Sequence, residues 1–508
     1  MLKRYFSMLR SEFSGYNLKA FSSDLMAGLT VTAVALPLAL AFGVSCGADA
    51  AAGLITAILA GLVIGALSGA SFQISGPTGA MSAVLVTIIA KFGLDGVFAV
   101  SFFAAILILL CALFKLGRFV SLIPRPVITG FTSGIALIIA LGQIDNFFGT
   151  HSVGEDAIAK LGSFLTGKAG TIDWKALVIG LIVVAVMIAW PKKWNARVPS
   201  SLVGIIVATV VSTLAGFDIA TVGEIPRKLF LESRLSFASI EWARILEYLS
   251  PAISIAALAM IESLLCGASA SRMKNEPFDA DQELVAQGIG NLIIPFFGGV
   301  PATAAIARTS VAIKSGAVTR VCGIIHALGL LASMFLLGPI MAKLPLSALA
   351  GVLMVTAWRM NEWHDIKTFF RRKNASAIAK FLITMIATVL FDLTVAILIG
   401  IGFSCLLFVI KCAHIELTER KSEDGTTVIA VTGALFFGNI GKFRKRLGEM
   451  TEGKDAFILS LAGVTAIDTT AVSSLEELCG ERSVIIDNAI PKIAAQLSKA
   501  GLIPSDKH

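Results

Sequence analysis

Two charged residues stand out because they lie in apolar stretches, where charged side chains are rare. Glu262 lies within the run 257–265, and Arg308 follows the Gly/Pro-rich stretch 298–303 by about one helical turn. A charge at the centre of a bilayer costs about 3 kcal/mol or more on insertion scales, so a functional reason for it is expected. An unpaired buried carboxylate tends to hold a proton. We therefore predict that Glu262 binds and releases a proton and that Arg308 partners an anion.

Two other interpretations of these residues stay open at this point. Arg308 could extend to the membrane edge beside Lys314, and Glu262 could form a static ion pair with Arg308 that holds two halves of the protein together.

Two short segments interrupted by Gly and Pro accompany these charges. They are Ser75-Gly76-Pro77-Thr78-Gly79 and residues 298–303, which contain Pro301. A proline near a helix start leaves the other first-turn N–H groups free. Half-helices that start at about Thr78 and Thr303 would direct those donors and their positive dipole ends toward the middle of the membrane. This arrangement suits an anion.

The composition places these segments in a membrane. The chain has 508 residues, of which 56% are hydrophobic and 15% charged, with a mean hydropathy of +0.84. Soluble domains are about 45–50% apolar and about 25% charged, so a soluble enzyme is excluded as the main interpretation. The seven cysteines form no Cys-x-x-Cys pair, so neither a disulfide framework nor a metal site is indicated, and no cofactor is expected. The net charge of +8 is spread over loops, which argues against nucleic-acid binding.

The apolar segments define a polytopic α-helical membrane protein. Fourteen are present, at 24–44, 51–68, 77–92, 96–114, 126–142, 174–190, 200–216, 250–268, 283–297, 303–313, 318–338, 345–357, 376–391 and 393–411. After residue 411 the composition turns polar, with short β-branched runs such as 426–431, 456–461 and 483–486. We therefore predict an N-terminal segment 1–23, a membrane transport domain 24–411 and an α/β domain 412–508.

The distribution of basic residues predicts the topology. The N-terminus and the loops after even-numbered segments hold 19 Lys and Arg residues, among them Arg118, Lys192, Lys193 and Arg197, whereas the loops after odd-numbered segments hold 9. The positive-inside rule then puts both termini and the α/β domain in the cytoplasm of a multi-pass protein of the plasma or inner membrane.

The two broken segments also occupy corresponding places. Each falls about 50 residues after the start of its half of the chain, at Asp24 and at Pro251. Matched interrupted segments indicate a transporter whose binding site is built from inverted repeats.

Several motifs resemble the sulfate permease (SulP) family of anion transporters. The first motif contains Asp24, Gly28 and Pro37, and the last, 295–309, contains Gly298, Gly299, Pro301 and Arg308. The others are 75–81, 130–134, 261–265 and 283–291. The tail, with 431–438 and Asp468-Thr469-Thr470-Ala471, resembles the STAS domain that follows the transport domain in this family. A Ser/Thr/Asp cluster at this place is typical of a helix N-cap, although Thr470 aligns with a serine that is phosphorylated in related antagonists.

The resemblance implies a fold and a site. It implies seven-plus-seven inverted repeats divided into core and gate domains, an elevator-like motion, a homodimer, and a small anion such as sulfate, bicarbonate, chloride or a dicarboxylate as substrate. It places the anion on backbone N–H groups near Thr78-Gly79 and near Ala304-Ala305, with Arg308 close behind. We expect selectivity to depend on Gln73, Phe131 and Ile306. The predicted substrate-binding residues are Gln73, Thr78, Gly79, Ala80, Thr303, Ala304, Ala305, Ile306 and Arg308, and the predicted proton-coupling residue is Glu262.

The coupling ion is predicted from a difference between this chain and the sodium-coupled members of the family. Sodium-coupled bicarbonate members resemble this chain in the motif 75–79 but carry aspartate where Glu262 stands, and a hydroxyl where Cys266 stands. This difference favours a proton and predicts proton-coupled symport of a dicarboxylate such as fumarate, or of sulfate. The alternatives are sodium–bicarbonate symport and uncoupled anion exchange or leak. A nucleobase permease would need an acid where Arg308 stands, and an anion sensor would need an output partner.

Overall fold

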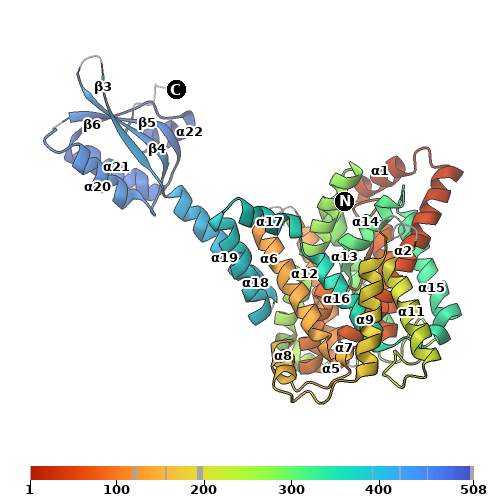
Figure 1. The fold of residues 1–508 in the computed structure, drawn as a ribbon. Helices are drawn as coiled ribbons and strands as arrows, with labels where there is room; N and C mark the ends of the chain where they lie inside the picture. Colours follow the sequence, from red (N-terminus) through yellow and green to blue (C-terminus); the bar gives the residue numbers. More distant parts are fainter. Residues whose placement is uncertain are drawn as a thin grey trace. The chain divides into compact units, whose positions relative to one another are not determined.

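The chain divides into two compact units, Met1–Ile401 and Gly402–His508 (Figure 1). The computed structural model describes residues 2–117, 123–154, 157–191, 198–238, 240–391, 393–422, 425–454 and 456–503. The predicted loop residues Arg118, Lys192, Lys193 and Arg197 lie outside the described residues.

The first unit is a bundle of membrane helices, and the predicted fold class is confirmed. Seven described helices are long and apolar enough to cross a membrane, and four shorter apolar helices accompany them. The first half contains α1 (Leu2–Glu12), α2 (Leu18–Ser45), α3 (Ala50–Leu59), η1 (Ala60–Ile64), α4 (Gly65–Leu67), α5 (Gly79–Leu113), α6 (Arg125–Gly142), α7 (Ile144–Phe148), α8 (Ala157–Leu165), α9 (Trp174–Ala189) and α11 (Ser200–Leu214). The second half contains α12 (Ile245–Lys274), α13 (Ala280–Ile293), α14 (Ile306–Lys314), α15 (Val321–Met341), α16 (Leu346–Met360), α17 (Trp363–Arg371), α18 (Ala375–Leu390) and α19 (Leu393–Cys412).

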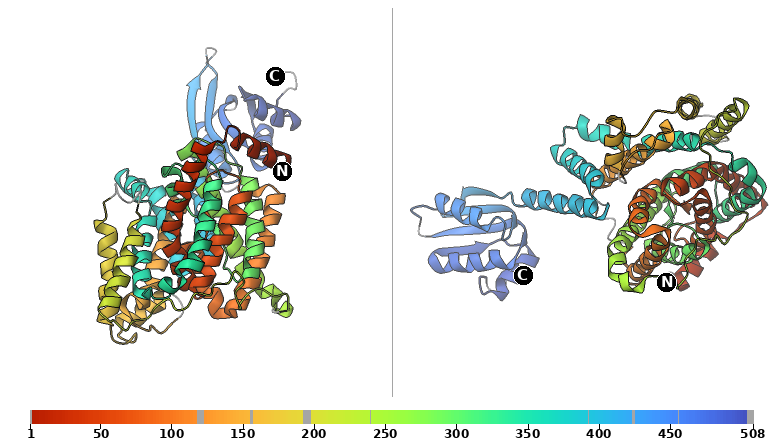
Figure 2. Two further views of the ribbon diagram at one scale, coloured as in Figure 1. Left: turned by 90° about the vertical axis from the view of Figure 1, so that its right-hand side faces the viewer. Right: turned by 90° about the horizontal axis from the view of Figure 1, so that it is seen from below.

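The two halves repeat one order of elements. In the first half, α2 and the continuous run α3–η1–α4 are followed by the two-residue strand β1 (Ser75–Gly76); in the second half, α12 and α13 are followed by β2 (Thr303–Ala304). In each half, the next helix starts just after the strand. The predicted segments 77–92 and 96–114 both fall within α5, which changes direction at Gly93, where φ is +69°. That left-handed conformation favours glycine. At the level of the whole bundle, α7 and α8 lie at the end opposite to the N-terminus, whereas α17 lies at the N-terminal end (Figures 1 and 2).

Glycines allow close helix crossings in the bundle. A Cβ atom added at Gly53 of α3 would lie 2.1 Å from the carbonyl oxygen of Ala39 on α2. On α6, Cβ atoms at Gly130 and Gly134 would lie 2.4 Å from Phe381 O and 2.5 Å from Thr388 Cβ, both on α18. Small residues spaced by four are typical of such interfaces in membranes, where backbones must approach closely.

The N-terminal helix is fastened to the bundle by a buried ion pair. Glu12 accepts hydrogen bonds from Arg320 at 2.7 Å (Nη2), 2.9 Å (Nε) and 2.7 Å (backbone N). The two side chains are only 4% and 6% exposed. Arg320 also donates to the carbonyl oxygens of Ala66 and Ser68, which lie at the end of α4. The pair therefore joins α1, the end of α4 and the start of α15.

A second buried carboxylate fixes the start of α2. Asp24 accepts hydrogen bonds from the backbone N–H groups of Val318 and Thr319 at 2.6 and 3.0 Å, from Thr319 Oγ1 at 2.6 Å, and from the Tyr16 hydroxyl at 3.0 Å. Burial, followed by this hydrogen bond with Asp24, raises the pKa of Tyr16 above its ordinary value. These bonds satisfy backbone donors that precede α15.

The second unit is an α/β domain with a four-stranded sheet. Its elements are β3 (Glu416–Lys421), β4 (Thr427–Leu435), α20 (Ile440–Met450), β5 (Ala456–Ile467), α21 (Thr469–Glu481), β6 (Ser483–Asp487) and α22 (Pro491–Lys499). The strand order is β3-β4-β5-β6, with β3 antiparallel to β4 and the other pairs parallel. Asp468 is the N-cap of α21 and accepts from the N–H of Ala471 at 2.8 Å. The N-cap interpretation of the Asp468-Thr469-Thr470 cluster is thereby confirmed.

Replacement of Asp24 by Asn should destabilise the bundle. An amide has one acceptor oxygen and would place an NH₂ group against the N–H groups of Val318 and Thr319, and breaking hydrogen bonds to a charged group costs about 1.5–3 kcal/mol each. We expect a melting temperature in detergent that is lower by several degrees. The matched control is Asp95→Asn, since Asp95 is exposed. Equal melting temperatures for the two variants would contradict the proposed role of Asp24.

Candidate anion-binding site

The candidate site is organised by a two-residue ribbon that joins the halves of the bundle. β1 and β2 pair antiparallel, with Ser75 opposite Ala304 and Gly76 opposite Thr303. α5 begins three residues after β1, and α14 begins two residues after β2. Because the strands are antiparallel, the two helices leave the ribbon in opposite directions, and both positive N-terminal dipole ends face it.

The start of α5 offers free backbone donors. Thr78 is the N-cap residue, and its Oγ1 accepts from the N–H of Met81 at 3.3 Å. The N–H of Ser82 bonds to the carbonyl oxygen of Thr78. Within the described part of the chain, the N–H groups of Gly79 and Ala80 have no acceptor. Such groups at a helix N-terminus can bind an anion.

The start of α14 offers its free donors slightly further along the chain than expected. The N–H of Ala304 bonds to Ser263 Oγ at 3.1 Å, and the N–H of Ala305 bonds to the carbonyl oxygen of Ile74 at 2.9 Å. Among the described residues, the N–H groups of Ile306 and Ala307 have no acceptor. Ile306 is 48% exposed, so open space adjoins these donors. The binding role of this stretch stays a prediction.

Arg308 lies beneath the ribbon and does not reach the membrane edge. Its side chain is 1% exposed, and Nη2 donates to the carbonyl oxygen of Pro77 at 2.7 Å. Nη1 has no partner among the described residues. A Cβ atom at Gly76 would lie 2.6 Å from Nη1, so only glycine leaves room for the guanidinium here. Arg308 thus joins α14 to the turn that precedes α5.

Glu262 faces the start of α5 from α12. Thr78 Oγ1 donates to Glu262 Oε2 at 2.9 Å. In the described structure, the carboxylate forms no ion pair with Arg308, so the static-pair interpretation is not what the geometry shows. The neighbouring residue Ser263 faces β2, where its Oγ lies 3.0 Å from Thr303 Oγ1.

Buried polar residues that the sequence had not assigned hold the ribbon in place. Gln287 Nε2 donates to Ser75 Oγ at 3.0 Å, and Thr309 Oγ1 accepts from the N–H of Ile74 at 3.0 Å. Asn291 bonds to both the N–H and the carbonyl oxygen of Ala302, at 2.7 and 2.9 Å. The spacing of Gln287 and Asn291, four residues apart on one face of an apolar helix, was the signal that could have identified them.

The remaining predicted residues have less direct relations to the ribbon. Gln73 Nε2 donates to the carbonyl oxygen of Ser263 at 2.7 Å. Phe131 is buried on α6, but α6 approaches the start of α5 through Ile139, whose Cδ1 would lie 2.3 Å from a Cβ atom at Gly79. The thiol of Cys266 lies 3.4 Å from Thr309 Oγ1. Among the described residues, no three His, Cys, Asp or Glu side chains group as metal ligands would.

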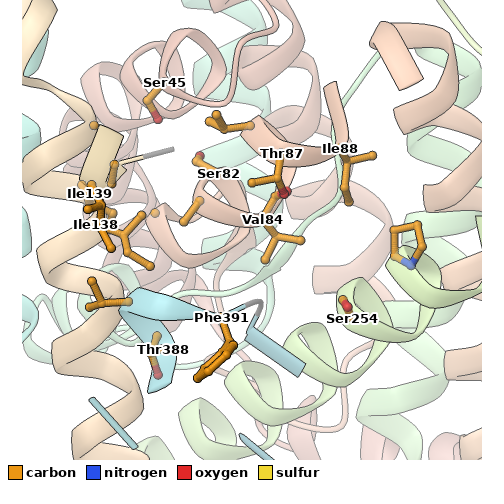
Figure 3. Close-up of a pocket in the computed structure, with 18 of the residues that line it drawn as sticks. Ser45, Ser82, Val84, Thr87, Ile88, Ile138, Ile139, Ser254, Thr388 and Phe391 are labelled. Carbon is orange, nitrogen blue, oxygen red and sulfur yellow. The ribbon is translucent and has the colours of Figure 1, made fainter. Parts of the chain in front are cut away.

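A cavity of about 480 Å³ leads away from the start of α5. At its inner end it is lined by Gly79 and Ser82 and at its outer end by Lys91, Lys160 and Glu247. Figure 3 shows side chains around the space, with Ser45 from α2, Ser82, Val84, Thr87 and Ile88 from α5, Ile138 and Ile139 from α6, Ser254 from α12, and Thr388 on α18 with Phe391 just after it. Because Lys160 belongs to α8, the cavity opens toward the end of the bundle opposite to the N-terminus (Figure 1).

Fold and site together define a multi-pass membrane transporter for anions. The chain belongs to the sulfate permease family, whose model matches residues 21–387, and a STAS domain model matches residues 418–504. This confirms the family resemblance inferred from the motifs, and the family is one of transporters.

Named relatives cover almost the whole chain. The putative sulfate transporter YvdB of Bacillus subtilis is 35% identical over 482 residues, 91% of this chain and 89% of its own length. The bicarbonate transporter BicA of Picosynechococcus is 29% identical over 526 residues, 95% and 92% of the two chains.

Solved structures share the fold. The transmembrane domain of a cyanobacterial BicA has a TM-score of 0.69 at 28% identity and covers 75% of this chain and 98% of its own. Murine Slc26a9, an anion transporter solved in the inward-facing state, has a TM-score of 0.84 at 17% identity over 96% of this chain and 89% of its own.

Replacement of Arg308 by Ala should weaken anion binding. It removes the donor to Pro77 and the free Nη1 group, and hydrogen bonds to charged groups are worth about 1.5–3 kcal/mol. We expect the apparent substrate constant for uptake into liposomes to rise by about 10- to 100-fold. The measurement is the concentration dependence of initial uptake.

Gly76→Ala tests the same site without changing a charge. The added methyl group should displace the guanidinium and raise the substrate constant in the same direction as Arg308→Ala. Gly162→Ala is the matched control, because a Cβ atom at Gly162 meets nothing within 4 Å. A normal constant for both Arg308→Ala and Gly76→Ala would place Arg308 outside the site.

Proposed function

We propose that the protein is a proton-coupled anion symporter that takes up a dicarboxylate such as fumarate, or sulfate. The anion binds between the starts of α5 and α14, and an elevator-like movement of the core against the gate exposes it to alternate sides. The observation that carries the proposal is the hydrogen bond between Glu262, a titratable group, and Thr78, the cap of the helix that would hold the anion.

The Thr78 hydroxyl can link protonation of Glu262 to binding of the anion because it has only one hydrogen to donate. When Glu262 is ionised, that hydrogen is donated to Oε2. When Glu262 is protonated, its own O–H can donate to Thr78 Oγ1, and the hydrogen of Thr78 becomes free to turn toward an anion. Protonation therefore adds a donor to the site and removes a negative charge from beside it.

The anion itself is held mainly by neutral groups. The free N–H groups of Gly79, Ala80, Ile306 and Ala307 converge from two helix starts, and Arg308 adds a buried positive charge behind them. An ionised Glu262 beside this site would repel a dianion, since like charges interact strongly away from water. Proton binding and anion binding should consequently favour each other.

Sodium–bicarbonate symport is the second candidate. It is supported by the similarity to BicA, which is named as a bicarbonate transporter. Sodium prefers oxygen ligands, and the position one turn after Glu262 is the thiol of Cys266, which is a poor ligand for a hard cation. Uncoupled exchange or leak is the third possibility, in which Glu262 would only support Thr78.

We further propose a homodimer in the plasma or inner membrane with both termini and the STAS domain in the cytoplasm. The excess of basic residues at the N-terminal end of the bundle supports this orientation. In that case the cavity of Figure 3 faces outward, so the described conformation would receive the anion from outside.

Uptake by purified protein in liposomes tests the proposal. Labelled fumarate and labelled sulfate are offered with and without an inward proton gradient, and bicarbonate is offered with and without a sodium gradient. Accumulation of fumarate or sulfate that requires the proton gradient and collapses with a protonophore supports it. Accumulation of bicarbonate that depends on sodium alone would replace it by the second candidate.

Glu262→Gln should abolish proton coupling without abolishing movement of the anion across the membrane. The amide cannot ionise but can still bond to Thr78, so proton-driven accumulation should be lost while downhill exchange of the anion persists at least in part. The measurement compares both activities in the same liposome preparation.

Glu247→Gln is the matched control for this variant. Glu247 lies in the first turn of the same helix, where it pairs with Arg244, so its replacement should preserve the dependence of accumulation on the proton gradient even where it changes the rate of anion entry. If Glu262→Gln lost accumulation and exchange equally, Glu262 would have a structural role instead.

A further inference from the structure

The second unit carries a basic helix directly beside the end of a membrane helix. Four of the eleven residues of α20 are basic, namely Lys442, Arg444, Lys445 and Arg446, and one, Glu449, is acidic. Arg444 is paired with Glu477 and Glu481 on α21. Within the described chain, Lys442 and Lys445 have no acidic partner, and both are exposed. No carboxylate in the described part of the domain therefore neutralises these two charges.

Hydrogen bonds hold this basic helix close to the end of α19. α19 is an apolar span that ends at Cys412. Asn439, the residue before α20, donates to the carbonyl oxygen of Ala413 at 3.4 Å, and Arg446 Nη1 donates to that of Ile415 at 3.5 Å. Three extended residues span at most about 10 Å. α20 is therefore held close to the end of α19, and basic residues that lie within about one Debye length of a membrane surface are attracted appreciably to anionic lipid.

Apolar groups accompany the charges at the same corner of the domain. Phe437, in the turn just before α20, is 72% exposed. Beside it is an apolar cavity of about 260 Å³ between the end of α19 and the ends of β4 and β5. Its lining residues are Phe408, Val409, Cys412, Ala434, Leu435, Phe436, Ala466, Ile467 and Asp468. A basic face beside exposed aromatic and apolar surface is typical of helices that bind anionic membranes.

We propose that α20, with Phe437 and the cavity beside it, lies against the anionic phospholipid surface of the membrane that α19 spans. Lys442 and Lys445 contact lipid phosphates, and Phe437 enters the layer between headgroups and acyl chains. Lys411, in the last turn of α19, lies at the same level and adds to the positive face. The STAS domain is thus anchored by lipid as well as by the peptide chain.

The full-length protein in lipid nanodiscs provides the test. A nitroxide is attached at Phe437→Cys in a background in which Cys111, Cys405, Cys412 and Cys479, the cysteines that are not buried, are serine. Relaxation by lipid-soluble oxygen and by a water-soluble nickel chelate reports whether the label lies in lipid or in water. We expect the label to be accessible to oxygen and protected from nickel in discs that contain phosphatidylglycerol. It should be markedly more accessible to nickel in discs of phosphatidylcholine alone.

Two double variants that remove the same charge distinguish lipid binding by the basic face of α20 from a general attraction between a positive domain and anionic lipid. Lys442→Gln with Lys445→Gln should abolish the dependence on phosphatidylglycerol. Lys492→Gln with Lys499→Gln, which removes the same charge from exposed positions of α22, should preserve it. Identical nickel accessibility in the two lipid compositions would overturn the proposal. So would protection in both compositions with broadening between labels, because a second copy of the chain would then cover this face.

Discussion

The structure depends on one constraint, which is that no backbone donor or acceptor can be left unpaired within the hydrocarbon layer. Two helices that begin in the middle of the bundle break this rule at their starts. The ribbon of β1 and β2 satisfies part of the exposed backbone, and side chains of Ser263, Thr309 and Asn291 satisfy more. A small set of N–H groups at the two helix starts is left without acceptors among the described residues. These free N–H groups form the candidate site. An anion bound there, as we propose, would complete the hydrogen bonding of the fold.

The same constraint on buried polar groups explains where Arg308 and Glu262 lie. Arg308 is fully buried and is held by the carbonyl oxygen of Pro77 rather than by a carboxylate. Its charge is therefore not neutralised by a fixed partner within the described structure and can act on a ligand in the site. Glu262 is kept apart from it and bonds to Thr78 instead. A direct pair between these two groups would have made each unavailable to the transported ions.

The sequence predicted the parts of this site better than their assembly. The fourteen apolar segments, the two broken ones, Glu262 and Arg308 were recognisable because each differs from its local surroundings in hydropathy, charge or Gly/Pro content. The pairing of Ser75 with Ala304 and the capture of the Ala304 N–H by Ser263 were not predicted. They depend on the register between segments more than 200 residues apart in the chain, and nothing in local periodicity specifies that register. For the same reason the partners of the Ala304 and Ala305 N–H groups within the protein could not be predicted.

The buried pair of Glu12 and Arg320 has a consequence for biosynthesis. Its partners are separated by 308 residues, and chains grow at about 5–20 residues per second. α1 therefore leaves the ribosome about 15–60 s before the arginine that will hold it has been made. During that interval the first helix lacks its buried ionic partner, although Tyr5 can already donate to the carbonyl oxygen of Ala66 in the first half. The ion pair can form only once the second half of the bundle has been made.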